Sequence, residues 1–120
     1  MKDDNVLQKK SYAFAIRIVK AVQYLANEKK EYVLSKQLLR SGTSIGANTE
    51  EAIGGQSDRD FYAKLNIVYK EARETSFWIR LLKDTNYFEE SHADSLLLDC
   101  EEILKIVGSI IKTMKAKMGK

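Results

Sequence analysis

Apolar residues recur at alternating steps of three and four through most of this chain, and this spacing limits its fold more than any other feature. An α-helix turns once in 3.6 residues, so residues at these steps share one face, whereas a half-buried strand alternates at every second residue. Proline is absent and only six of the 120 residues are glycine, which leaves few of the breaks that strands and hairpins require. The pattern therefore predicts an all-helical protein.

Four segments carry this apolar pattern, and short polar turns separate them. Gly54 and the glycine after it follow the second segment as a stop signal, while Ser57 and Ser91, each with an aspartate three residues later, have the spacing of N-terminal caps. Helices of similar length joined by short turns pack most simply as an antiparallel up-down-up-down four-helix bundle, which makes residues 1–120 one domain. The predicted helices span about residues 6–27, 35–53, 58–84 and 91–116.

Composition narrows the class of protein. Hydrophobic residues make up 44% and charged residues 31%, which is typical of a globular domain. No apolar run reaches the roughly 20 residues of a membrane span, and the polar start of the chain has no apolar secretion core behind it. We therefore expect a cytoplasmic protein that does not contact membranes. Cys100 is the sole cysteine, so it is expected to lie on a buried helix face and not in a disulfide or metal cluster.

Residue types that are typical of catalytic or metal-binding sites are scarce in this chain. His92 is the sole histidine, and with Glu89 it has the Glu-x-x-His spacing of di-iron bundles. Such sites need two of these motifs in mid-helix, and this one falls in a turn or a first helical turn, so we interpret His92 as a solvated loop histidine. The stretch from Ser41 to Gly46 lacks the lysine of a phosphate-binding loop. We expect no catalytic residue, metal, cofactor or small-molecule substrate.

The second predicted helix carries the most informative stretch of the chain. Gly42 and Gly46 share one face, and because each glycine costs about 1 kcal/mol of helix propensity relative to alanine, they predict a close contact with another backbone. A second, polar face needs hydrogen-bond partners, for which Arg73, Glu74 or a neighbouring subunit is available. This polar face either fixes helix register or binds a ligand directly. Its members are Gln37, Ser41, Ser44, Asn48 and Glu51.

Basic residues share a face in two of the predicted helices. Each set could bind successive phosphates of a nucleic acid, or simply form a solvated surface, and the net charge of +3 permits either interpretation. Aromatic residues could stack on unpaired bases, or pack in the core or in an interface; they are Phe61, Tyr62, Tyr69, Phe77, Trp78, Tyr87 and Phe88. The candidate RNA-binding residues are Lys10, Arg17 and Lys20 in the first helix and Lys70, Arg73 and Arg80 in the third.

Three runs of sequence together resemble a known family. Residues 37–52, followed by 60–65 and 71–75, are similar to the bacterial four-helix bundle proteins encoded by intervening sequences of 23S rRNA genes. The chain also resembles, more distantly, the accessory proteins of diversity-generating retroelements. The resemblance extends from about Tyr12 to Leu104. The hallmark residues of the family fall on Gln37, Arg40, Ser41, Ser44, Asn48, Glu51, Phe61, Leu65 and Glu74.

This resemblance implies a four-helix protein that assembles into a ring-shaped homopentamer and associates with structured RNA or ribosomal components. It implies no enzymatic activity. Two functional hypotheses follow. In the first, the protein is homo-oligomeric and binds RNA phosphates through the basic faces of its helices. In the second, it is an adaptor that receives a protein partner, such as a reverse transcriptase, through the surface of its bundle or ring.

Overall fold

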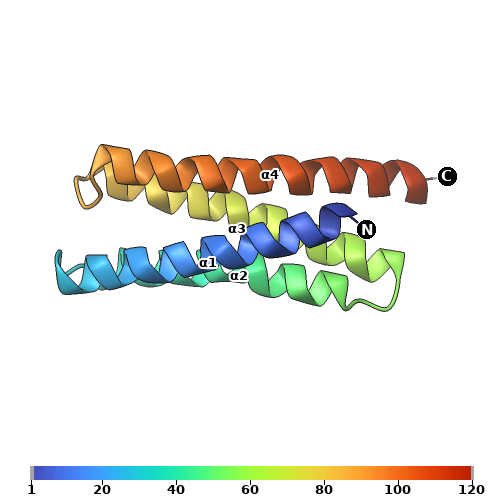
Figure 1. Cartoon of the computed structure of the whole chain (residues 1–120), viewed down its shortest axis with the longest axis horizontal. Coiled ribbons are helices and arrows are strands. Elements are labelled where there is room, and N and C mark those ends of the chain that lie inside the picture. Colours follow the sequence, from blue (N-terminus) through green and yellow to red (C-terminus); the bar gives the residue numbers. More distant parts are fainter. Residues whose placement is uncertain (1, 120) are drawn as a thin grey trace.

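The computed structural model describes residues 2–119, with side chains from residue 6 onward, and these residues form four helices (Figure 1). The helices are α1 (Lys2–Asn27), α2 (Leu34–Ile53), α3 (Asp58–Asp84) and α4 (Glu90–Met118). Successive helices run in opposite directions along a body 50 Å long. Each helix packs against its neighbours in the chain, and α4 returns to contact α1. The predicted all-α antiparallel four-helix bundle is confirmed.

The observed helices begin and end close to the predicted positions, with two extensions. The first helix starts at Lys2 and not near residue 6, and the last runs from Glu90 to Met118, beyond the predicted 91–116. Periodicity detects only the part of a helix that buries an apolar face, whereas the backbone hydrogen-bond pattern continues past that part. None of the described helices has an apolar stretch long enough to cross a membrane.

The apolar stripes of the sequence form one continuous core between the four helices. Cys100 is 1% exposed, and burial, reinforced by the negative charge of Glu101, raises the pKa of its thiol to about 12. The thiol therefore stays protonated and packs as a small hydrophobe, as predicted. Eight large apolar side chains of this core are at most 1% exposed: Phe14, Ile18, Leu38, Ile45, Leu65, Ile79, Leu96 and Ile103.

The caps predicted around the turn between α2 and α3 are present. The amide of Gly54 donates to the carbonyl of Glu50 at 3.1 Å and closes α2, and the hydroxyl of Ser57 accepts from the amide of Asp60 at 3.1 Å. Both bonds satisfy backbone groups that a helix end otherwise leaves without a partner. The position of this turn could be predicted from the sequence because each capping hydrogen bond joins residues no more than four positions apart.

The cap predicted at Ser91 is wrong, because α4 begins one residue earlier and its N-cap position, Glu89, makes no side-chain hydrogen bond. Phe88 is 3% exposed at the end of the bundle, and its burial fixes where the chain turns. His92 lies in the first turn of α4, one of the two places expected for it, but it is not a solvated loop residue. Its ring is half-buried in the first turn of α4, with ring centroids 6.3 Å from Tyr24 and 5.2 Å from Phe88.

A buried glutamate that the sequence did not reveal caps the start of α2. The Glu31 carboxylate accepts hydrogen bonds from the amides of Ser35, Leu34 and Val33, at 2.8, 3.1 and 3.2 Å. The Ser35 hydroxyl in turn donates to the Glu31 carbonyl at 2.9 Å. Burial alone would raise the pKa of Glu31, but the hydrogen bonds from these backbone amides outweigh it and the net shift is downward. The folded protein therefore favours the ionised carboxylate.

Glu31→Gln should lower the free energy of unfolding by about 1–2 kcal/mol at neutral pH, because it replaces a charged acceptor of three amides with a neutral one. The pKa of Glu31 is lower in the folded state, so its stabilisation is present above the unfolded-state pKa and is lost as pH falls through the folded value. Urea unfolding at pH 7 and at pH 3 should therefore show a difference between the two proteins that shrinks at the lower pH. Glu28→Gln, at an exposed residue of the same turn, is the control and should leave stability unchanged.

Candidate nucleic-acid interface

The two glycines of α2 face α1. A Cβ atom built on Gly42 would lie 2.8 Å from both Cγ1 and Cγ2 of Ile18, and one built on Gly46 would lie 3.4 Å from the carbonyl oxygen of Ser11. Ile18 is fully buried and β-branched, so it has no free rotamer that would make room. The predicted close contact with another backbone is therefore at Gly46, whereas Gly42 makes room for the side chain of Ile18.

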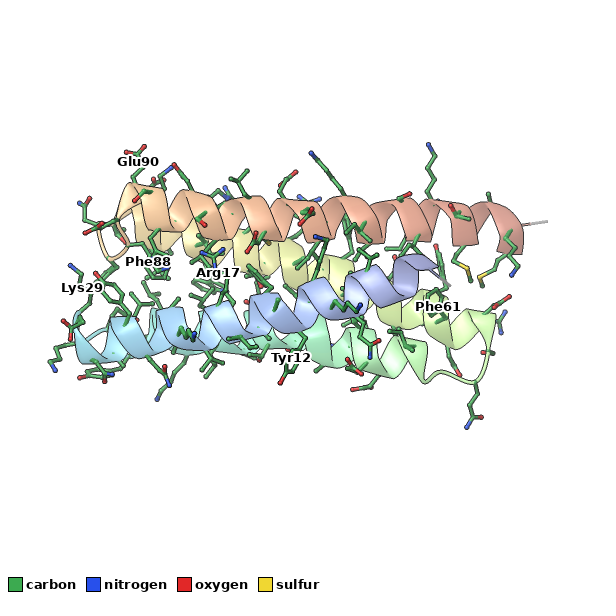
Figure 2. The ribbon with its side chains drawn as sticks, in the orientation of Figure 1. Tyr12, Arg17, Lys29, Phe61, Phe88 and Glu90 are labelled. Carbon is green, nitrogen blue, oxygen red and sulfur yellow. The ribbon has the colours of Figure 1, made fainter. Side chains whose placement is uncertain are left out.

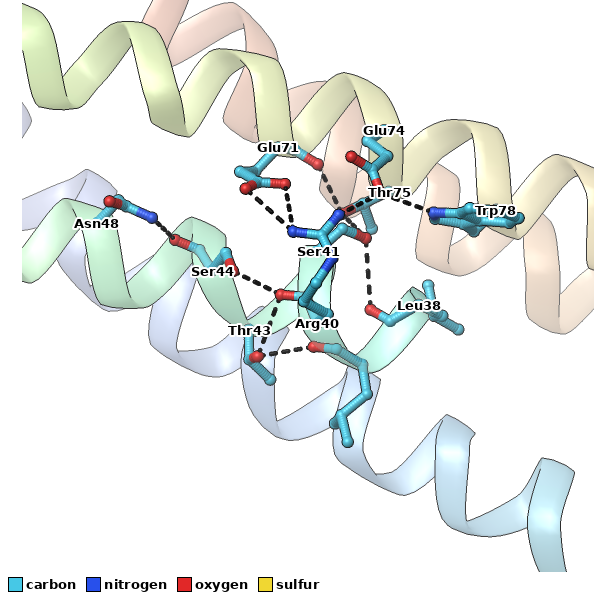
Figure 3. A network of polar contacts seen from close by, with 11 residues as sticks. Leu38, Arg40, Ser41, Thr43, Ser44, Asn48, Glu71, Glu74, Thr75 and Trp78 are labelled. Carbon is cyan, nitrogen blue, oxygen red and sulfur yellow. Dashed lines mark hydrogen bonds and ion pairs between the residues drawn. The ribbon is translucent and has the colours of Figure 1, made fainter. Parts of the chain in front are cut away.

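The neighbouring polar face of α2 is turned toward α3 (Figure 3). The Thr75 hydroxyl donates to the Ser41 hydroxyl at 2.9 Å, and both side chains are fully buried. A buried hydroxyl without a partner is destabilising, so this pair favours one alignment of α2 with α3. The Ser44 hydroxyl donates to the Arg40 carbonyl and the Asn48 amide to the Ser44 carbonyl, both within α2, and Lys64 of α3 donates to the Glu51 carboxylate.

Arg40 joins the two helices at the surface edge of this face. Its guanidinium donates to the Glu71 carboxylate at 3.2 Å and also to Glu74, whose carboxylate accepts from Nε1 of Trp78 at 3.0 Å (Figure 3). The Trp78 and Arg40 hydrogen bonds together lower the pKa of Glu74, and the bond to Glu74 raises the pKa of Arg40. We call Arg40, Glu71, Glu74 and Trp78 the α2–α3 clamp.

The Ser41–Thr75 and Arg40–Glu74 bonds favour the register interpretation of the polar face, because each of them links α2 to α3. The expectation that Arg73 is a hydrogen-bond partner of this polar face is wrong. Arg73 takes no part in the clamp, since it lies on the other flank of α3, beside α4. Gln37 is exposed and makes no side-chain hydrogen bond within the described residues. The sequence identified the polar face correctly but could not say which flank of α3 it meets.

The basic residues of α1 are largely held in ion pairs with α4. Nζ of Lys10 lies 3.1 Å from Oε1 of Glu102, and Nη1 of Arg17 lies 2.6 Å from Oδ2 of Asp99. Arg17 also donates to the hydroxyl of Ser95 at 3.0 Å, and Figure 2 shows it between the two helices. Lys20 is exposed and forms no ion pair within the described residues. Two of the three candidate cations on α1 are therefore engaged in holding the bundle together.

The basic residues of α3 are differently placed. Lys70, Arg73 and Arg80 are all exposed, and none forms an ion pair with another residue in the described part of the chain. Arg73 and Arg80 line an open groove of about 410 Å³ between α3 and α4, and Lys105 of α4 lines it from the other side. Glu101 is the one carboxylate among the lining residues. We call the groove lined by Arg73, Arg80 and Lys105 the cationic groove.

Lys105 is a candidate residue that sequence reasoning missed. It lies 25 positions after Arg80, so no helical spacing relates the two, and only the packing of α3 against α4 brings them to one groove. Within the described residues, no group of three or more histidine, cysteine, aspartate or glutamate side chains is arranged to hold a metal ion. The cationic groove, with three cations and one carboxylate in its lining, would attract an anionic group.

Residues 3–109 match the family model of the 23S rRNA-intervening sequence protein. The chain belongs to this family. Its fold is similar to the crystal structure, at 1.70 Å resolution, of a protein with unknown function from the S23 ribosomal protein family of Bacteroides thetaiotaomicron VPI-5482, with a TM-score of 0.90 and 53% sequence identity. That alignment covers 92% of this chain and 98% of the other. Among curated proteins, none matches the chain.

In this member of the 23S rRNA-intervening sequence protein family, the two flanks of α3 differ in their contacts. The flank toward α2 carries the clamp, which includes two positions that the resemblance marks as hallmarks, Arg40 and Glu74. The flank toward α4 carries the cationic groove. Hallmark residues thus hold the helices in register, while the unpaired cations lie on the opposite flank, open to solvent.

Proposed function

We propose that this protein is a non-enzymatic RNA-associated protein that holds phosphates of structured RNA in its cationic groove. The observation that carries the proposal is the set of three cations, Arg73, Arg80 and Lys105, that line one groove without an ion pair to any described residue. Guanidinium groups bind phosphate oxygens through paired hydrogen bonds, and lysine adds a point charge. The family name refers to 23S rRNA and the similar structure to a ribosomal protein family, which supports RNA as the partner.

The proposal includes assembly into a homo-oligomer, with a ring of five copies as the expected form. A single chain has a net charge of only +3, whereas symmetry would repeat the cationic groove and add the potentials of its copies. A strip of exposed apolar residues on α1 supports self-association: Tyr12, Ile16 and Val19 are 67, 43 and 39% exposed. Such a strip is typical of a surface that another protein covers.

The same apolar strip supports a second candidate function, that of a protein adaptor. Tyr12, which projects from α1 in Figure 2, borders a hollow of about 270 Å³ lined also by Ala15, Thr43 and Ala47. An apolar side chain of a partner such as a reverse transcriptase could enter this hollow. Under this alternative the apolar strip carries the function and the cationic groove is an ordinary solvated surface.

Light scattering of the purified protein, with and without a structured rRNA fragment, tests the first proposal. The protein alone should have the mass of an oligomer, and RNA should add to that mass at about 50 mM salt and much less at about 200 mM, because phosphate contacts weaken as salt rises. A mass unchanged by RNA at the lower salt would rule out RNA binding and leave the adaptor function. A monomeric mass would rule out the ring.

A further inference from the structure

An exposed aromatic ring lies in the middle of the basic face of α3. Phe77 follows Arg73 by four positions and precedes Arg80 by three, so the three residues share one face of the helix. At a rise of about 1.5 Å per residue, the ring is attached about 6 Å along the axis from one arginine and about 4.5 Å from the other. Phe77 is 48% exposed, although an aromatic side chain ordinarily gains stability from burial.

The ring of Phe77 is held in place from one side. Its centroid lies 5.0 Å from that of Trp78, with 74° between the planes, which is an edge-to-face contact. Trp78 is itself fixed by its hydrogen bond to Glu74, and Glu74 by Arg40 of α2. The α2–α3 clamp therefore positions the exposed ring. An aromatic side chain has only two torsions, so it loses little freedom on binding a flat partner.

We propose that Phe77 stacks on an unpaired base of an RNA whose phosphates lie on Arg73 and Arg80. This inference rests on the RNA association proposed above and specifies its substrate. In a duplex the bases are stacked on one another and offer no free face, whereas loops, bulges and single strands do. Every base has a π face, so the stacking selects unpaired RNA with little preference for sequence. The ligand is therefore a single-stranded segment of RNA.

The test compares the parent protein and its Phe77→Leu variant, which keeps an apolar side chain but removes the aromatic face. The probes are an unstructured oligouridylate and a fully paired RNA duplex of equal length, measured by fluorescence anisotropy. Loss of one stacked base should weaken oligouridylate binding on the order of 10-fold or more and leave duplex binding unchanged. Phe77→Tyr should bind as the parent does. Leu98→Ala, at a residue 72% exposed on α4, is the control and should change neither affinity.

A second readout uses Trp78, the sole tryptophan of the chain. A base stacked on Phe77 lies next to the indole, so oligouridylate should change tryptophan fluorescence in the parent and much less in Phe77→Leu. Equal oligouridylate affinity in the two proteins, with binding still lost on charge reversal of Arg73 and Arg80, would overturn the stacking role and leave RNA association standing. Absence of any RNA binding by the parent would overturn both. Circular dichroism establishes that each variant is folded.

Discussion

Replacing Gly42 with leucine should lower the free energy of unfolding by about 3 kcal/mol, a large share of the stability of a small domain. Even the Cβ atom would lie 2.8 Å from two atoms of Ile18, and the rest of the leucine side chain would push α1 and α2 apart. The gain in helix propensity, about 1 kcal/mol over glycine, is too small to compensate. Urea denaturation followed by circular dichroism measures the change.

Gly108→Ala measures the gain in helix propensity at a glycine that has no close neighbour. Gly108 is also a mid-helix glycine, but a Cβ atom there would meet only Cε2 of Tyr69, at the ordinary contact distance of 3.6 Å. Alanine should therefore stabilise the protein at this position by about 1 kcal/mol through helix propensity alone. If Gly42→Leu were also stabilising, the close packing of α2 against Ile18 would be wrong.

Reversing two charges of the cationic groove should weaken RNA binding on the order of 100-fold at low salt. Arg73→Glu with Arg80→Glu removes two phosphate contacts and places two carboxylates in the groove beside Glu101. Each lost contact with a single strand should also reduce the slope of log affinity against log salt by about 0.7, so the double variant should lose about 1.4 in slope. Titrations at several salt concentrations measure both quantities. Both arginines are exposed, so folding should be unaffected.

The control for charge reversal makes the same change in net charge elsewhere. Lys9 on α1 and Lys36 on α2 are exposed, and neither lines the cationic groove. Lys9→Glu with Lys36→Glu should therefore leave the salt slope close to that of the parent, with a modest loss of affinity from long-range charge alone. An equal loss in both double variants would mean that RNA responds to net charge only. The groove would then have no special role.

Much of the fold was predictable because the signals that determine it are local. Apolar spacing placed the helices, and Ser57 and Gly54 marked their ends, since each of these patterns acts within a few residues along the chain. The cap from Glu31 was not predictable, because glutamate is not a usual capping residue and its carboxylate reaches forward over four positions. The half-buried ring of His92 depended on Tyr24, a residue of another helix.

The sequence by itself determined four amphipathic helices, the glycine contact of α2 and the presence of basic residues on α1 and α3. Only the tertiary structure decided which of those basic residues are available to a partner. Arg17 pairs with Asp99, 82 positions away, whereas Arg73 and Arg80 face a groove shared with Lys105. Pairing between side chains so far apart in the sequence depends on how the helices are rotated and aligned against one another. Core packing sets that alignment, and the spacing of charges along any one helix does not.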